Sequence, residues 1–187
     1  MASLTVLGGG PEHGRLENLS RSLGIEKEVS FLGWVSHTEA LRLLGDSDVL
    51  VFPSVRDFGG GVVFEALAVG AVPLVVDFGG PGDIVNAEVG FKVPLTNESD
   101  VTQQMEKILN EIAENPSRLS RLRQQGMRYA KDRLTWEAKA KETTKVLEWA
   151  LRRGPRPDLL PPKSLGKKTA FLHEGDVQSE MPVTGDH

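Results

Sequence analysis

The chain has 187 residues, a formal net charge of −4 at pH 7 and no cysteine. This length suits one ordinary domain with some excess and is too short for two full nucleotide-binding domains. The charge balance gives no footprint for nucleic acid or anionic lipid, and the lack of cysteine excludes disulfides, iron–sulfur clusters and thiolate zinc sites. No apolar run approaches the roughly 20 residues that cross a bilayer, and the sequence does not start like a secretory signal. We therefore expect a cytoplasmic protein without a membrane span.

The first 95 residues alternate short apolar runs with amphipathic stretches. The runs that predict strands are residues 4–7, 29–32, 48–53, 72–76 and 89–93. The stretches that predict helices are residues 15–23, a segment opened by the capping box Ser36 and Glu39, a segment through residues 65–69, and a short turn opened by residues 79–82. This alternation predicts right-handed crossovers and a Rossmann-like, doubly wound parallel sheet, in which the run 48–53 is buried on both faces.

From residue 97 onward the pattern becomes helical. An apolar stripe from Val101 to Ile112 predicts one helix, the pair Asn115-Pro116 is typical of the start of a second, and Thr135 caps a third. Beyond residue 153 the chain shows no period, and 5 of its 11 prolines fall there. We therefore expect one domain over residues 1–153 and a disordered tail over residues 154–187.

The most informative segment follows the third predicted strand. In a doubly wound sheet, ligands bind where the carboxyl ends of strands meet the starts of helices. Gly59, Gly60 and Gly61 stand at such a junction, where glycines let the backbone approach a ligand and aim N–H groups outward. The helix that follows adds its partial positive charge, so the loop is predicted to receive a phosphate or another anion. Asp57 and Glu65 would repel that anion directly, and they are better suited to accept hydrogen bonds from flanking hydroxyls, one from a ribose and one from a sugar.

The spacing of Asp57 and Glu65 in this segment resembles the E-x7-E signature of retaining GT-B glycosyltransferases of group 1 (family 4). Residues 7–11, 29–35 and 79–85 resemble three further motifs of that family, in the same order, and the similarity covers about residues 4–150. The resemblance implies the C-terminal, donor-binding half of a GT-B fold. It also implies transfer of a hexosyl group from a nucleotide diphosphate sugar to a glycan, lipid or small-molecule acceptor, with no metal or other cofactor.

The resemblance assigns roles to the matching positions. Glu65 would bind the ribose hydroxyls, Asp57 would be the catalytic residue that contacts the donor sugar, and the backbone at Val35 would border the base. Main-chain N–H groups would bind the sugar and diphosphate; the donor-binding positions that supply them are Phe58, Gly59, Gly60, Gly61, Val62 and Val63. Asp57 is one methylene shorter than the glutamate usual in the family, a difference that bears on its reach and on sugar choice.

The family's domain normally opens with a strand and helix whose Arg and Lys clamp the diphosphate, and an N-terminal acceptor-binding domain precedes it. The sequence matches neither part. We therefore expect the chain to lack its first βα unit and its acceptor domain, to be inactive alone, and to reach its acceptor only through an N-terminal domain. We expect no nucleic-acid partner and no membrane span, while peripheral association with a membrane stays open.

Several alternatives remain. Asp57 could simply cap a helix or form a turn. Gly8 and Gly10 suggest a dinucleotide fingerprint, but His13 stands where the third glycine is required, which favours a structural turn. The four histidines are scattered and predict no metal site. Trp136 and Trp149 share a helical stripe that either packs or stays exposed for a partner. The rival functions are a non-catalytic nucleotide-sugar-binding module and a dinucleotide-dependent oxidoreductase.

Overall fold

The computed structural model describes residues 2–158. The chain divides into a unit over Met1–Arg156 and a second over Pro157–His187, and only residues 157 and 158 of the second unit are described. The disordered tail expected over residues 154–187 therefore lies almost entirely outside the described residues. Everything below concerns the first unit.

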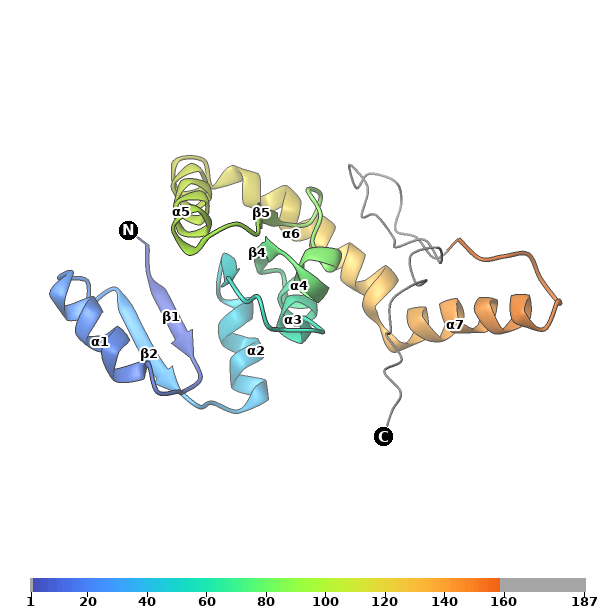
Figure 1. Cartoon of the computed structure of the whole chain (residues 1–187), viewed down its shortest axis with the longest axis horizontal. Coiled ribbons are helices and arrows are strands. Elements are labelled where there is room, and N and C mark those ends of the chain that lie inside the picture. The colour runs from blue at the N-terminus through green and yellow to red at the C-terminus, as the bar shows by residue number, and fades with distance from the viewer. Residues whose placement is uncertain (1, 159–187) are drawn as a thin grey trace, which may run out of the picture. The chain divides into compact units, whose positions relative to one another are not determined.

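The described chain is an α/β domain with parallel strands followed by helices, which confirms the predicted fold class. Its elements in chain order (Figure 1) are β1 Leu4–Leu7, α1 His13–Ser22, β2 Val29–Gly33, α2 His37–Gly45, β3 Val49–Phe52, α3 Gly61–Val69, β4 Val72–Asp77, α4 Gly79–Ile84, β5 Phe91–Pro94, α5 Glu98–Glu114, α6 Ser117–Tyr129, the π-helix η1 Ala130–Leu134 and α7 Trp136–Ala150. The helix expected from Asn115-Pro116 begins at Ser117, with Pro116 at its N-cap.

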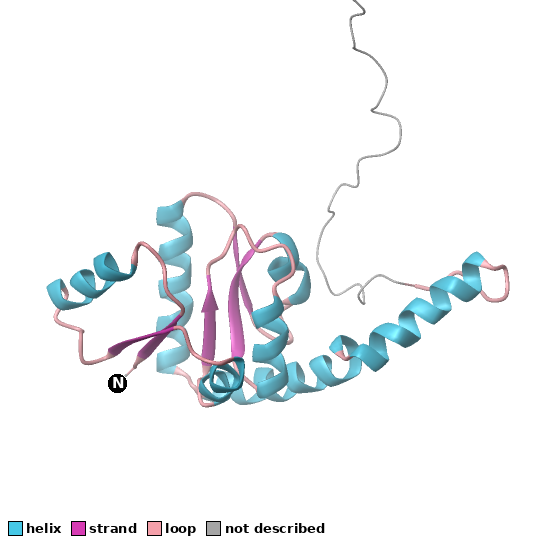
Figure 2. Cartoon of the chain, turned by 90° about the horizontal axis from the view of Figure 1, so that it is seen from below, coloured by secondary structure: helices cyan, strands magenta, loops and turns pink. Residues whose placement is uncertain are grey.

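The parallel strands lie in two sheets (Figure 2, magenta). In the first, β1 pairs with β2 and Leu4 lies opposite Val29. In the second, the order is β3-β4-β5, so that β4 is central. Among the described residues, the strands β1, β2, β3 and β5 therefore each keep one edge without a paired strand.

The core is built around β4, in which every residue before Asp77 is buried. Val75 packs on one face against Val63 and Leu67 of α3, and Leu74 packs on the other face near Met105 of α5. Three layers result, with α3 on one side of the sheet and α5 on the other. Burial on both faces was expected of the run 48–53, and this is wrong: no residue of β3 is buried, and Val51 is 37% exposed, because fewer elements cover this strand at the edge of the sheet.

Substitution of Leu67 tests the packing of this core. Its side chain is 1% exposed, and Gly126 of α6 approaches so closely that an added Cβ would lie 2.9 Å from Leu67 Cδ2. Leu67→Ala is expected to lower the free energy of unfolding by about 2–5 kcal/mol, because the packed helices cannot close the cavity. Urea unfolding measures the loss, and Leu147→Ala, at a side chain 58% exposed, should change stability by less than about 0.5 kcal/mol. Equal effects of the two substitutions would contradict this packing.

The part of the chain before β3 adds no apolar side chain to the core. Among its described residues only Ser20 is buried, and its hydroxyl donates to the carbonyl of Glu17 at 2.8 Å. Its exposed large apolar side chains are Leu4, Leu7, Leu19, Leu23, Ile25, Leu32 and Trp34. β1, α1 and β2 thus keep their form chiefly through backbone hydrogen bonds.

Thr135 is the N-cap of α7, as expected, and its hydroxyl accepts the N–H of Ala138 at 3.2 Å. It packs against η1, and no residue along it is buried. Trp136 is 88% exposed and Trp149 is 44% exposed, so the helical stripe is open rather than packed. No helix in the described part of the chain has the length and apolar character needed to cross a membrane.

Candidate functional site

The predicted anion loop, residues 57–61, leaves the carboxyl end of β3 and leads into α3. We call it the glycine loop. Asp57 Oδ1 accepts the main-chain N–H groups of Gly59 at 3.0 Å and Gly60 at 2.6 Å. Gly60 is the N-cap of α3 and has a left-handed backbone, with φ of 62°, which glycine adopts without strain. The structure therefore shows the turn-forming role considered for Asp57.

The glycine loop packs directly on the start of α4. A Cβ added at Gly80 would lie 2.3 Å from the carbonyl oxygen of Phe58, and one at Gly60 would lie 3.1 Å from the nitrogen of Pro81. The predicted turn over residues 79–82 is helical, and its glycines allow this close backbone contact. The Phe58 side chain itself projects outward and is 97% exposed.

The start of α3 presents unused hydrogen-bond donors. Within the described residues, the main-chain N–H groups of Gly61 and Val62 have no hydrogen-bond partner. The N–H of Val63 donates to the carbonyl of Gly60 at 2.8 Å and is thus engaged in the helix. Of the N–H groups expected to bind the nucleotide sugar, those of Gly59 and Gly60 donate to Asp57, and those of Gly61 and Val62 are free within the described residues. The helix dipole favours an anion at this end.

Glu65 lies one helical turn beyond these donors. Its side chain is 37% exposed, and its Oε1 lies 2.9 Å from Nε2 of His37. His37 is the first residue of α2, which packs on α3, and Val35 lies two residues before it. The structure thus brings His37 to Glu65, and Val35 is close to His37 along the chain. His37 was not predicted from the sequence, although its position just after the predicted cap Ser36, near the carboxyl end of β2, is a signal that points to it.

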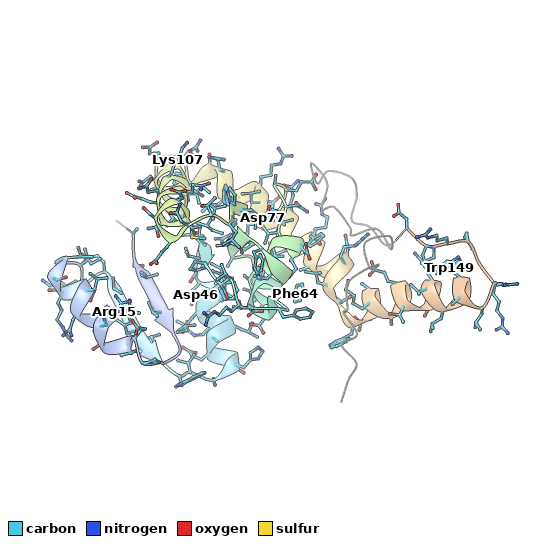
Figure 3. The ribbon with its side chains drawn as sticks, in the orientation of Figure 1. Arg15, Asp46, Phe64, Asp77, Lys107 and Trp149 are labelled. Atoms are coloured by element: carbon cyan, nitrogen blue, oxygen red, sulfur yellow. The ribbon has the colours of Figure 1, made fainter. Side chains whose placement is uncertain are left out.

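Glu65 also borders an open depression of about 380 Å³. Its walls come from α3 and from the region where α6 passes into η1 and α7; the lining residues are Phe64, Glu65, Ala68, Met127, Ala130, Lys131, Leu134 and Thr135. Figure 3 labels Phe64 on α3. Glu65 therefore follows the free N–H groups of α3 along the helix and also borders a mainly apolar depression.

Basic side chains near the glycine loop are few. Lys92 of β5 is 19% exposed, and its ammonium donates to Asp77 Oδ1 at 2.8 Å and to the carbonyl of Gly82 at 2.9 Å. Asp77, labelled in Figure 3, ends β4. Lys92 therefore links the end of β4 to α4. Arg56, next to Asp57, is exposed, and only its main-chain N–H is hydrogen-bonded, to the Ser54 hydroxyl at 3.4 Å.

The turn at residues 8–10 has the structural role expected from the sequence. Gly8 has a φ of 102°, and its N–H donates to the carbonyl of Gly33 at 2.7 Å. The ring of Trp34 covers Gly9, 3.1 Å from where a Cβ would be. The carboxylate of Glu12 stands at the start of α1, paired with Arg15, where a phosphate would have to sit. This geometry gives no support to a dinucleotide site.

The described residues hold no group of three or more His, Asp or Glu side chains arranged to bind a metal ion.

At the start of α2, the Arg42 guanidinium bonds the Glu39 carboxylate and holds the pKa of Glu39 below its usual range. The capping box is therefore only half formed: Ser36 accepts the N–H of Glu39 at 3.2 Å, while the Glu39 carboxylate turns to Arg42.

The turn held by Asp57 is expected to contribute to the stability of the domain. Asp57→Ala removes the acceptor for two N–H groups at the start of α3 and is expected to cost about 0.5–2 kcal/mol of unfolding free energy. Asp57→Asn retains a side-chain oxygen and should cost clearly less. Urea unfolding of the two variants decides this, and equal losses would show that Oδ1 does not hold the loop.

An α/β domain with free helix N–H groups and a carboxylate at the carboxyl ends of parallel strands has the form of a nucleotide-binding domain. The model of the family described as "Glycosyl transferases group 1" matches residues 1–128, and the chain belongs to this family. Its fold is that of the C-terminal half of a GT-B glycosyltransferase.

Three similar proteins illustrate the match. An uncharacterised glycosyltransferase of Methanocaldococcus jannaschii is 30% identical over 80% of this chain and 38% of its own length. The glycogen synthase of Mycobacterium tuberculosis is 29% identical over 84% of this chain and 38% of its own length. The crystal structure of Anabaena HepE in complex with UDP-glucose superposes with a TM-score of 0.63 at 20% identity, covering 79% of this chain and 41% of that one. The chain thus spans about 38% of the length of these curated relatives.

Proposed function

We propose that this chain is the donor-binding portion of a retaining glycosyltransferase that transfers a hexosyl group from a nucleotide diphosphate sugar. The observation that carries the proposal is the arrangement along α3. The open N–H groups of Gly61 and Val62 begin the helix, and Glu65 follows after about 6 Å of helical rise. One nucleotide diphosphate can reach both, with its diphosphate at the N–H groups and its ribose hydroxyls at the Glu65 carboxylate.

Asp57 retains a way to contact the sugar. Its Oδ1 holds the glycine loop, while its Oδ2 has no partner among the described residues. A sugar hydroxyl that donates to Oδ2 would leave the turn intact. Asp57 therefore combines the loop-forming role that the structure displays with the sugar-contacting, catalytic role that the family implies. The backbone of Val35, close to His37, would border the base.

The chain's contribution to the reaction is electrostatic. In sugar transfer the departing nucleotide diphosphate gains negative charge, and preorganised N–H donors at a helix start stabilise such charge. The described residues offer few cations for the same purpose, since Lys92 is bonded to Asp77 and to the carbonyl of Gly82. We infer that the chain binds donor but needs an acceptor-binding domain and further basic groups for turnover.

Calorimetric titration with a panel that includes UDP-glucose and GDP-mannose tests the proposal. We expect weak binding of at least one donor and no sugar release by the chain alone, and then transfer once an N-terminal acceptor domain of the family is supplied. Absence of binding across the panel would contradict the proposal. Binding that never leads to transfer would favour the alternative, a non-catalytic nucleotide-sugar-binding module. A dinucleotide-dependent oxidoreductase, the weaker alternative, would enhance the fluorescence of NADH on binding it.

A further inference from the structure

His37 and Glu65 meet from two different helices. His37 Nε2 lies 2.9 Å from Glu65 Oε1. The start of α2 is fixed by Ser36, whose hydroxyl accepts the N–H of Glu39, and α2 packs on α3. Both side chains therefore extend from well-placed backbone, and their contact does not depend on a mobile loop.

The contact is unusual within the described chain. It is the one side-chain hydrogen bond or ion pair there that joins β1, α1, β2 or α2 to a later element. The His37 side chain is 69% exposed and that of Glu65 37% exposed, and an exposed pair of this kind adds little to folding stability. A contribution to folding stability therefore explains the His37–Glu65 contact poorly. The orientation that His37 gives to the Glu65 side chain explains it better.

The contact with His37 orients the Glu65 carboxylate and leaves it able to accept further hydrogen bonds. Each carboxylate oxygen can accept two hydrogen bonds. Oε1 accepts one from the imidazole when Nε2 carries the proton, and Oε2 has no partner among the described residues. Two neighbouring hydroxyls of a ribose can therefore still be accepted. A Glu side chain that is already oriented loses less conformational freedom on binding than one that is free to rotate.

We propose that His37 is a positioning residue for the ribose of the bound nucleotide, which it serves by holding the Glu65 carboxylate in the orientation that accepts two ribose hydroxyls. This inference rests on the proposed function, because it needs Glu65 to bind ribose. His37 acts through Glu65 and need not touch the nucleotide. The neighbouring charges on α2 are engaged elsewhere, since Arg42 bonds both Glu39 and Asp46.

Titration of the full chain with UDP-glucose, and with GDP-mannose in parallel, tests the inference. His37→Ala is expected to weaken binding about three- to tenfold, the loss that corresponds to ordering one long side chain. His37→Gln retains an N–H donor and is expected to keep the affinity within about twofold. Thr38→Ala, at the next exposed position of α2, is the matched control and should leave the affinity unchanged.

A double-mutant cycle separates positioning from direct contact. If His37 acts through Glu65, His37→Ala should cause no further loss in a chain that already carries Glu65→Ala. A 2′-deoxy analogue of UDP-glucose offers one hydroxyl less to Glu65, and the effect of His37→Ala should shrink with it. If His37 served only the fold, the effect of His37→Ala would be reduced neither by the Glu65→Ala substitution nor by the 2′-deoxy analogue.

The outcomes distinguish this inference from the function on which it rests. Wild-type affinity in His37→Ala, together with weak binding by Glu65→Ala, would overturn the positioning role and leave the proposed function standing. An undiminished His37→Ala effect in the Glu65→Ala chain would also overturn it. Unchanged binding by Glu65→Ala, or no binding of either nucleotide sugar by the wild-type chain, would contradict the proposed function and this inference together.

Discussion

Glu65→Ala is expected to lower the affinity of the chain for its nucleotide sugar by roughly ten- to a hundredfold. The ribose hydroxyls would lose a charged acceptor, and one hydrogen bond to a charged group contributes about 1.5–3 kcal/mol. The Glu65 side chain is 37% exposed and is not part of the core, so the fold should persist. Calorimetry gives the affinity, and a urea titration confirms that the variant is folded.

The matched control is Glu106→Ala. Glu106 is an exposed carboxylate on α5, the helix that covers the opposite face of the sheet from α3. The two variants lose the same charge, so a difference between them reports the location of Glu65 and not the net charge of the chain. Equal affinities of wild type and a folded Glu65→Ala protein would remove Glu65 from the site.

Gly80→Ala is expected to damage the site through the backbone alone. The added Cβ would lie 2.3 Å from the carbonyl oxygen of Phe58 and 3.0 Å from the carbonyl carbon of Gly59. Because both are backbone atoms, the glycine loop itself must shift. Overpacking of this kind costs about 1–3 kcal/mol of stability. A shifted loop also misplaces the N–H groups at the start of α3, and we expect at least a tenfold loss of nucleotide-sugar affinity.

Gly14→Ala is the control for this second prediction. Gly14 lies in α1, outside the glycine loop, and a Cβ there would meet no atom within 4 Å. Urea unfolding and calorimetry on both variants should show a loss of stability and of affinity in Gly80→Ala alone. Wild-type behaviour of Gly80→Ala would mean that the loop and α4 are not in the close contact that the structure displays.

Local sequence patterns were sufficient for most of the secondary structure. Ser36, Asn97 and Thr135 each accept an N–H from the residue three places on, because short polar side chains compete well for the free N–H groups at helix starts. Gly70 ends α3 with a φ of 89°, a conformation that favours glycine. Such signals act within a few residues and can be recognised without knowledge of the fold.

Other features depend on packing between distant segments. The residues of β3 are as apolar as those of β4, so composition could not show that β3 is the edge strand. The π-helix η1 continues α6 with no distinct local signal. The contact between Gly80 and Phe58 joins residues far apart in sequence, and motif spacing indicated only a turn at residues 79–82.

The candidate site was predictable in its main acidic residues and less so in its details. The spacing of Asp57 and Glu65 placed Asp57 at the start of a glycine-rich loop and Glu65 in the helix after it, and the structure does the same. That Asp57 could form a turn or cap a helix was an alternative left open by the sequence, and the structure adds that its Oδ1 accepts the N–H groups of Gly59 and Gly60. The partner of Glu65 was not predicted, because His37 comes from another helix. The ligand roles of these residues stay predictions.

The thinly packed segment before β3 has a consequence for the solution behaviour of the protein. A region with only one buried residue has little free energy opposing its local opening, whereas β4 should open only with the whole domain. Backbone amides of β1 and β2 should therefore exchange with deuterium far sooner than those of β4. A nucleotide that binds both Val35 and Glu65 would connect this segment to α3 and slow the exchange of its amides. Deuterium uptake in β1 and β2 would then report whether the nucleotide site at α3 is occupied.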